Sequence, residues 1–166
     1  MGSQKILVAF ASKHGSTKEI AELLGDELAK HGLDVDVNRV QDIRNIMRYD
    51  IIVLGSAIYA GRWLRPARQF VYEFAEELAN RQIWLFSSGP IGNFLSPDAE
   101  KAVQLDLIIA FTKAKDHKIF AGKLDKSKLN FGERAVIAAV HGKEGDFRDW
   151  SAIKAWAKQI AKQSTQ

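Results

Sequence analysis

A loop rich in hydroxyl groups is the first candidate for chemistry in this chain. It consists of Ser12, Lys13, His14, Gly15, Ser16 and Thr17. The residues from Lys5 to Ala11 form an almost uninterrupted apolar run, typical of a strand buried on both faces, and helical spacing begins after Thr17. The loop therefore leads into a helix N-terminus, where free backbone N–H groups favour an anion such as phosphate. The hydroxyls could instead cap the helix, but capping accounts for one of them and not for three.

The motifs that are missing from this loop disfavour some classes of phosphate-bearing ligand. Gly15 is its single glycine, so it lacks the G-x-G-x-x-G of dinucleotide-binding folds and the G-x-x-x-x-G-K-[ST] of nucleoside triphosphatases. NAD and ATP are therefore disfavoured. A response-regulator receiver is excluded as well, because the third predicted strand ends in Leu54, Gly55 and Ser56, without a phosphate-accepting aspartate.

Two later loops carry small and aromatic residues. The loop after the third predicted strand contains Ser56, Ala57, Ile58, Tyr59, Ala60 and Gly61. The loop after the fourth contains Ser88, Gly89, Pro90, Ile91, Gly92, Asn93 and Phe94. Small residues let a ligand approach the backbone, and Tyr59 and Trp63 offer flat apolar faces, although Trp63 could also be a core residue at a helix entry. Together with the first loop they describe a pocket for an anion and a planar ring, the shape of flavin mononucleotide (FMN).

Five apolar segments alternate with helical segments and must position these loops. The predicted strands cover residues 5–11, 35–40, 50–55, 83–88 and 118–121. Parallel strands need crossover connections, whose helices cover the faces of the sheet. We therefore predict an α/β fold with a single doubly wound, five-stranded parallel sheet and helices on both faces, in one domain that spans residues 1–166. Ligands bind such sheets at the carboxyl ends of the strands, where the three loops lie.

The helices are predicted from the spacing of apolar residues and from their end signals. They run from Thr17 to just before Gly32, from Arg65-Pro66 to Leu78, from about Pro97 to Phe111, and from Asp149 or Ser151 to Ile160. Residues 133–140 fit a short Ala-rich helix, although Val136 and Ile137 could also belong to a strand.

The composition excludes several classes of protein. The chain has no cysteine, which excludes disulfide scaffolds, zinc ribbons and thiol nucleophiles, so any redox chemistry requires a bound cofactor. The net charge of +4 comes from mixed signs along the chain and predicts no nucleic-acid partner. The histidines lack metal-ligand spacing, so no metal site is predicted. We expect no transmembrane segment and, without a signal peptide, a cytoplasmic protein.

The first loop resembles the phosphate loop of flavodoxins, [ST]-x-T-G-x-T, with His14 in place of the usual hydroxyl residue. The resemblance covers essentially the whole chain. It implies FMN as cofactor, with its isoalloxazine ring against the two later loops, and a sheet order of 2-1-3-4-5. More narrowly, residues 55–61, 120–125 and 145–150 resemble flavodoxin-domain proteins grouped with menaquinone-dependent protoporphyrinogen oxidase. This similarity implies an oxidoreductase that reacts with a quinone or another redox partner.

A cluster of arginines lies beside the expected position of the ring. Arg62, Arg65 and Arg68 fall in a stretch, from Ile51 to Tyr72, that has no acidic residue. Positive charge lowers the energy of an anionic, two-electron reduced flavin and attracts an acidic or carboxylate-bearing partner. The same arginines could instead be a solvated helix face.

Two other groups of polar residues are open to a functional or a structural interpretation. His14 could donate a hydrogen bond to a phosphate or lie exposed in a tight turn. Asp146, Arg148 and Asp149 could form an ion-paired turn that braces the last helix, which we favour, or a lid over the ring. No side chain stands out as a catalytic acid or base.

Three functions fit these observations. The leading hypothesis is an FMN-dependent oxidoreductase, similar to protoporphyrinogen oxidase, that passes reducing equivalents from a small organic donor to a quinone-type acceptor. The second is a flavodoxin-like one-electron transfer protein without a substrate of its own. The third is a scaffold that retains the fold but not the cofactor. The colour of the purified protein separates the third hypothesis from the others, and stepwise reduction separates the first from the second.

Overall fold

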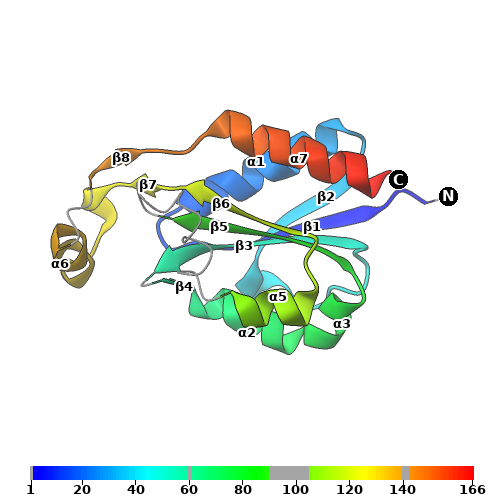
Figure 1. Ribbon diagram of the computed structural model, residues 1–166, viewed down its shortest axis with the longest axis horizontal. Helices are drawn as coiled ribbons and strands as arrows, with labels where there is room; N and C mark the ends of the chain where they lie inside the picture. The colour runs from blue at the N-terminus through cyan, green and yellow to red at the C-terminus, as the bar shows by residue number, and fades with distance from the viewer. Residues whose placement is uncertain (1, 60, 90–104, 140–142) are drawn as a thin grey trace.

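A computed structural model describes residues 2–59, 61–89, 105–139 and 143–166, and the structural statements below refer to these residues (Figure 1). Its central feature is a sheet whose parallel strands have the order β2-β1-β3-β5-β6. These strands are β1 (Lys5–Ala11), β2 (Asp34–Arg39), β3 (Ile51–Tyr59), β5 (Gln82–Gly89) and β6 (Asp116–Ala121). The two-residue strand β4 (Arg62–Trp63) adds to β3 in the antiparallel direction. Counted without β4, the order is the 2-1-3-4-5 expected from the sequence.

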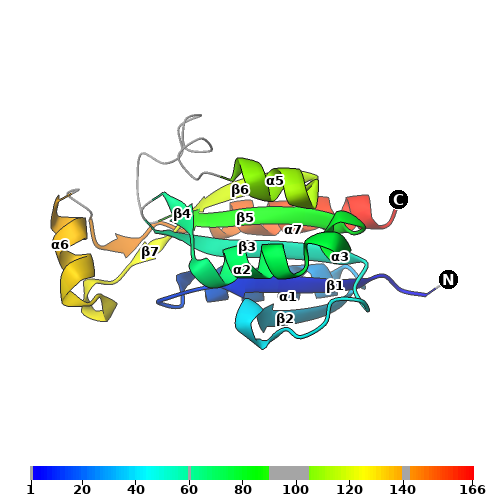
Figure 2. The ribbon, with the colours of Figure 1, turned by 90° about the horizontal axis from the view of Figure 1, so that it is seen from below.

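Helices cover both faces of this sheet (Figures 1 and 2). One face carries α1 (Ser16–Lys30) and α7 (Trp150–Ser164), which pack on Ile6, Val8 and Val53. The other face carries α2 (Arg65–Glu73), α3 (Ala75–Ala79) and α5 (Asp106–Thr112), which pack on Leu7, Leu54 and Leu85. Successive side chains of a strand point to opposite faces, so the continuous apolar runs of β1, β3 and β5 supply both cores.

The predicted second helix differs from the structure. An apolar stripe from Phe70 to Leu78 predicted one helix, but the chain forms α2 and then α3, with Phe74 between them at φ −107° and ψ 22°. Both helices still pack in one core cluster, so the stripe identified the buried face correctly. The predicted start of the next helix, near Pro97, lies outside the described residues, and α5 begins at Asp106.

A smaller lobe projects beyond the carboxyl ends of the strands (Figure 1). It comprises β7 (Lys123–Leu124), the 3-10 turn Lys126–Lys128, α6 (Phe131–Ala139) and β8 (Gly145–Asp146), which pairs with β7. A further 3-10 turn, Val40–Asp42, follows β2 in the main body. The helical alternative is correct for residues 133–139, Val140 lies outside the described residues, and none of the residues of α6 is buried.

No described helix is both long enough and apolar enough to cross a membrane.

Gly55 and Phe86 interlock at the centre of the sheet. They are partners in the register of β3 and β5, and the fully buried ring of Phe86 lies over Gly55. A Cβ atom at position 55 would lie 2.1 Å from Cζ of Phe86. The space beside Gly55 is therefore filled by this aromatic side chain.

We expect Gly55→Ala to lower the free energy of unfolding by about 2 kcal/mol, because an extra methyl group in a packed core forces its neighbours to move. Urea unfolding followed by circular dichroism measures the change. Gly132→Ala is the matched control, since its new methyl group would have Asn130 Oδ1 at 3.6 Å, an ordinary contact distance. Equal unfolding midpoints for the two variants would contradict the interlocked packing.

Candidate functional site

The parallel register brings the three predicted loops to one edge of the sheet. Ala11 at the end of β1 pairs with Ser56 of β3, and Ala57 of β3 pairs with Ser88 of β5. The loops that follow these strands therefore begin side by side. Ala60 and the predicted residues Pro90, Ile91, Gly92, Asn93 and Phe94 lie outside the described residues.

The loop of residues 12–17 has the geometry of an anion site. Gly15 is the N-cap of α1 and has φ 91°, a left-handed conformation that glycine adopts without strain. A Cβ atom at Gly15 would meet nothing within 4 Å, so the space beside this N-terminus is open. No side chain among the described residues caps α1. Backbone N–H groups at the start of the helix can therefore bind an external anion.

Two hydroxyls of this loop retain a proton that they can donate. Ser12 Oγ accepts a hydrogen bond from the Gly15 backbone N–H at 3.1 Å. Ser16 Oγ accepts one from the Lys123 backbone N–H at 3.1 Å, which links the loop to β7. Because a hydroxyl both accepts and donates, each O–H can still reach a phosphate oxygen. Thr17, in contrast, is only 1% exposed.

The side chains of Lys13 and His14 both contact Glu133, a residue that the sequence did not single out. Lys13 Nζ donates to Glu133 Oε1, and His14 Nε2 lies 3.1 Å from Glu133 Oε2. Burial, followed by the positive charges of Lys13 and Lys128, lowers the pKa of His14 below its usual value of 6.5. Because a carboxylate can only accept, the His14 Nε2–H donates to Glu133.

Tyr59 is the last residue of β3 and presents an aromatic side chain at this edge, because β3 continues through residues 56–59, which the sequence predicted to be loop. It is half-buried, and burial raises its pKa. Lys13 Nζ lies 5.0 Å from the centre of the Tyr59 ring, and the His14 ring lies 6.3 Å from it. Arg62 is the register partner of Tyr59 across β3 and β4. Lys13 and His14 of the candidate phosphate loop and Tyr59, the candidate contact of the flavin ring, are thus neighbours.

Several other predicted site residues hold the loops in place. Ser56 is fully buried, and its hydroxyl donates to Ala57 O and accepts from the Leu64 backbone N–H. Ile58 is 5% exposed and packs in a core cluster. Ser88 and Gly89 are buried at the end of β5, while Gly61 makes a turn with φ 71°.

Trp63 is a core residue and not a contact of the ring, which is the second of the two interpretations that its sequence context allowed. It is 2% exposed, and its Nε1–H donates to Ser87 Oγ at 2.8 Å. Ser87 Oγ also lies 2.8 Å from His117 Nε2. Burial lowers the pKa of His117 from 6.5 to about 4, so its ring is neutral and accepts the Ser87 proton. This chain of hydrogen bonds joins β4, β5 and β6 beneath the site.

The predicted basic cluster begins beside Tyr59 and continues onto α2. Arg62 and Arg65 are exposed, whereas Arg68 is half-buried and its Nε–H donates to Trp63 O at 3.2 Å. Arg68 therefore has a structural role in the loop, and Arg62 and Arg65 are the more accessible positive charges.

The bracing interpretation of residues 146–149 is confirmed. Arg148, whose side chain is 4% exposed, forms ion pairs with Asp146 and with Glu19 of α1, and its guanidinium stacks 4.4 Å from the centre of the Trp150 ring. The Asp149 carboxylate caps α7 by accepting the Ala152 backbone N–H at 3.0 Å. These contacts fix the start of α7 against the start of α1.

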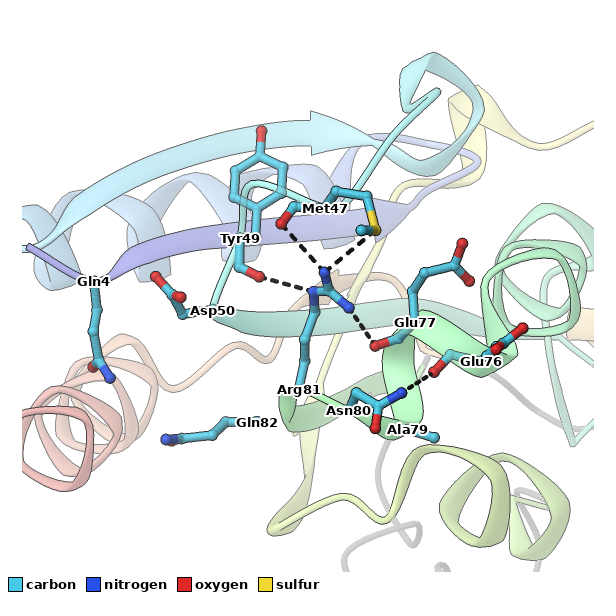
Figure 3. A pocket seen from close by; sticks show the side chains of 10 residues that line it. All are labelled: Gln4, Met47, Tyr49, Asp50, Glu76, Glu77, Ala79, Asn80, Arg81 and Gln82. Atoms are coloured by element: carbon cyan, nitrogen blue, oxygen red, sulfur yellow. Dashed lines mark hydrogen bonds between the residues drawn. The ribbon is translucent and has the colours of Figure 1, made fainter. Parts of the chain in front are cut away.

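A second groove lies at the amino ends of the strands, and the side chain of Arg81 in it stabilises the fold (Figure 3). The Arg81 guanidinium lies in it and donates to the backbone carbonyls of Met47, Tyr49 and Glu77. Its hydrogen-bonding capacity is used to join β5, α3 and the segment before β3. Among the described residues, no group of three or more His, Asp or Glu side chains is arranged to hold a metal ion.

The fold and the loop geometry define an α/β protein with a nucleotide site at the carboxyl edge of its sheet. The chain belongs to the flavodoxin family: a model of the flavodoxin domain matches residues 7–151. The open, uncapped N-terminus at Gly15 and the hydroxyls of Ser12 and Ser16 fit the phosphate of FMN. FMN is accordingly the cofactor of this flavoprotein.

Comparison with individual proteins supports this membership. The chain is 25% identical to "Protoporphyrinogen IX dehydrogenase [quinone]" of Escherichia coli strain K12, over 95% of this chain and 94% of that protein. A flavodoxin from the domain Archaea has a TM-score of 0.64 at 16% identity and covers 98% of this chain and 100% of its own. A Streptococcus pneumonia TIGR4 flavodoxin has a TM-score of 0.62 at 20% identity, with coverages of 96% and 99%.

The buried His117 predicts a dependence of stability on pH. Its pKa is about 4 in the folded protein against 6.5 for the free side chain. Below pH 6.5 the unfolded chain therefore binds a proton that the folded chain does not, so stability is complete above pH 6.5 and decreases as the pH falls toward 4. The expected loss from this group is about 3 kcal/mol, at 1.36 kcal/mol per pKa unit.

Urea unfolding at pH 7.5 and pH 4.5 measures this loss. His117→Asn replaces the imidazole with a polar group that does not titrate, so the variant should be less stable at pH 7.5 but lose less stability on acidification than the wild type. An unchanged difference between the two pH values in the variant would refute the role of His117.

Proposed function

We propose that this protein is an FMN-dependent oxidoreductase that takes reducing equivalents from a small organic donor bearing carboxylates and passes them to a quinone-type acceptor. The observation that carries the proposal is the pairing of Arg62 with Tyr59 across β3 and β4. It places positive charge next to the aromatic ring that we assign to the flavin. A partner that approaches there meets Arg62 and, on the first turn of α2, Arg65.

In this proposal the chain positions FMN by means of residues from separate loops. The backbone N–H groups at the start of α1 and the hydroxyls of Ser12 and Ser16 hold the phosphate. Tyr59 lies against the isoalloxazine ring, where an offset aromatic neighbour contributes about 0.5 to 1.5 kcal/mol beyond the area it buries. The buried hydroxyls of Ser56 and Ser87 keep the loop after β3 in shape through Leu64 and Trp63.

FMN supplies the electron-transfer chemistry when it is bound. The protein contributes binding, orientation and electrostatics. Arg62 and Arg65 attract the carboxylates of the donor. Their positive charge also stabilises the negative charge that the cofactor would carry when it is reduced. Each cycle removes two electrons and two protons from the donor and delivers them to one quinone, which leaves as the quinol. A donor that must lose more than two electrons, such as a porphyrinogen, therefore reacts in several cycles and consumes one quinone in each.

The E. coli relative supports a specific choice of donor and acceptor. Its name states that it is a dehydrogenase of protoporphyrinogen IX that uses a quinone, and its similarity covers 95% of this chain. Protoporphyrinogen IX carries propionate carboxylates that match a basic edge. We therefore select it as the donor to test, with a quinone as acceptor.

The phosphate assignment predicts the effect of a double substitution. Ser12→Ala with Ser16→Ala removes the two hydroxyls assigned to the phosphate and leaves the side chains similar in size. A hydrogen bond to a charged group contributes about 1.5 to 3 kcal/mol, so FMN affinity should fall about tenfold or more. Quenching of flavin fluorescence in a titration measures it. An unchanged affinity in a folded double variant would refute the phosphate assignment.

The proposed reaction is tested with FMN-loaded protein under anaerobic conditions, where the fluorescence of the porphyrin product reports oxidation of protoporphyrinogen IX by a quinone analogue. We expect turnover, and we expect Arg62→Glu with Arg65→Glu to raise KM for the donor about tenfold at low salt and less at high salt. Lys158→Glu with Lys162→Glu, which changes the charge equally at the exposed C-terminal half of α7, is the control. Absence of turnover, with FMN bound and reducible, would favour the one-electron transfer protein.

A further inference from the structure

The carboxylate of Glu133 occupies a position where it binds two side chains of the candidate phosphate loop. Its Oε1 accepts from Lys13 Nζ and its Oε2 accepts from His14 Nε2, across more than a hundred residues of sequence. Lys13, His14 and the N-terminus of α1 are the groups that would also attract a phosphate. An acidic side chain of the protein therefore already uses part of the anion-binding capacity of this loop.

Glu133 is held in this position by the start of α6. The Glu133 backbone N–H donates to Asn130 Oδ1 at 2.8 Å, and Glu133 Oε2 accepts the Asn130 backbone N–H at 3.1 Å. This reciprocal pair is a capping box, which needs Glu or Gln at the position of Glu133. The side chain of Glu133 is only 13% exposed. Its carboxylate thus belongs both to the cap of α6 and to the phosphate loop.

The contact with Glu133 also places Lys13 against Tyr59, the side chain that we assign to the isoalloxazine ring. The Lys13 ammonium lies 5.0 Å from the centre of the Tyr59 ring while it is paired with Glu133. A cation over an aromatic face occupies the surface on which another planar group would stack. The ion pair therefore lies over a face that we assign to the isoalloxazine, as well as next to the phosphate site.

The helix that carries Glu133 has few other attachments to the main body. None of its residues is buried, and Phe131 and Val136 are 91% and 63% exposed. Arg134 donates to Lys126 O, within the same lobe. The Glu133 contacts with Lys13 and His14 are consequently the polar contacts, among the described residues, that join α6 to the sheet domain.

We propose that Glu133 and the FMN phosphate compete for Lys13 and His14, so that α6 is held on the loop in the empty protein and is released when FMN binds. The inference rests on the proposed assignment of the phosphate to residues 12–17. A phosphate dianion at the start of α1 repels the nearby carboxylate and offers Lys13 a stronger partner. Movement of Lys13 from Tyr59 to the phosphate then clears the ring face in the same step.

The substitution Glu133→Gln tests the negative charge of Glu133 without removing the cap of α6. A glutamine carbonyl oxygen can still accept the Asn130 backbone N–H, so the capping box of α6 is retained while the negative charge is lost. Glu144→Gln is the control: Glu144 Oε1 accepts the Lys126 backbone N–H, so this variant loses the same charge from the same lobe without touching the phosphate loop.

Riboflavin provides the matched ligand, because it has the ring of FMN without the phosphate. Titrations followed by flavin fluorescence give dissociation constants for both. We expect Glu133→Gln to bind FMN about tenfold more tightly, which corresponds to about 1.4 kcal/mol, with a smaller change for riboflavin, and Glu144→Gln to bind both like the wild type. Weaker or unchanged FMN binding in Glu133→Gln, or an equal gain for riboflavin, would overturn the competition.

Hydrogen exchange measures the release of α6 directly. At short labelling times, amides of residues 131–139 should exchange faster in the FMN-loaded wild type than in the empty wild type, while amides of α7 serve as the internal reference. In Glu133→Gln the exchange of α6 should be fast with and without FMN. Equal or slower exchange of α6 after FMN binding to the wild type would contradict the release.

The Ser12→Ala, Ser16→Ala variant distinguishes failure of this inference from failure of the phosphate assignment. If that variant binds FMN like the wild type, the phosphate lies elsewhere and both proposals fail. If that variant loses FMN affinity while Glu133→Gln gains none, the phosphate assignment stands and the competition is refuted.

Discussion

The packing of the Phe86 ring over Gly55 is the constraint on which the position of the site depends. These residues are opposite each other in the register of β3 and β5, and only a residue without a side chain fits beneath the ring. A slip of one residue would place a side chain there and would also turn every residue of β5 to the wrong face. The same register sets Ala57 beside Ser88, and the pairing of β1 with β3 sets Ala11 beside Ser56. The starts of the loops that follow β1, β3 and β5 are thereby brought to one edge.

The sequence predicts the parts of this architecture that depend on local patterns. Apolar runs identify β1, β3 and β5 because both faces of these strands are buried, and Gly15 with the hydroxyls of Ser12 and Ser16 marks a strand-to-helix loop. Contacts between distant residues cannot be read in this way. The Trp63 Nε1 bond to Ser87 Oγ spans 24 positions and that of Ser87 to His117 spans 30. Trp63 could therefore be assigned from its sequence context either to the ring or to the core, and the register decides for the core.

Glu133 shows the same limit at the phosphate loop. Asn130 and Glu133 have the spacing of a capping box, so the sequence contains a signal for the start of α6. The second role of the carboxylate depends on where the pairing of β7 with β8 places α6 relative to Lys13, 120 positions away. The sequence around Lys13 and His14 indicates only that these side chains can bind an anion. The acidic group that they contact comes from a lobe whose helix buries none of its own residues.

The charges along this edge differ between the loop of residues 12–17 and the segment that follows Tyr59. At the phosphate loop, Lys13 and His14 contact an acidic side chain of the chain itself, so the net attraction for an added anion there is reduced. Around Tyr59 the local sequence supplies Arg62, Arg65 and Arg68 and, from Ile51 to Tyr72, no acidic residue. These two groups are close together, because Lys13 Nζ lies 5.0 Å from the centre of the Tyr59 ring and Arg62 is the register partner of Tyr59. Charges interact over such short distances even at physiological salt, where screening extends over about 8 to 10 Å. A substitution at Lys13 or Glu133 therefore also changes the electrostatic potential at Tyr59, and one at Arg62 also changes it at the loop of residues 12–17.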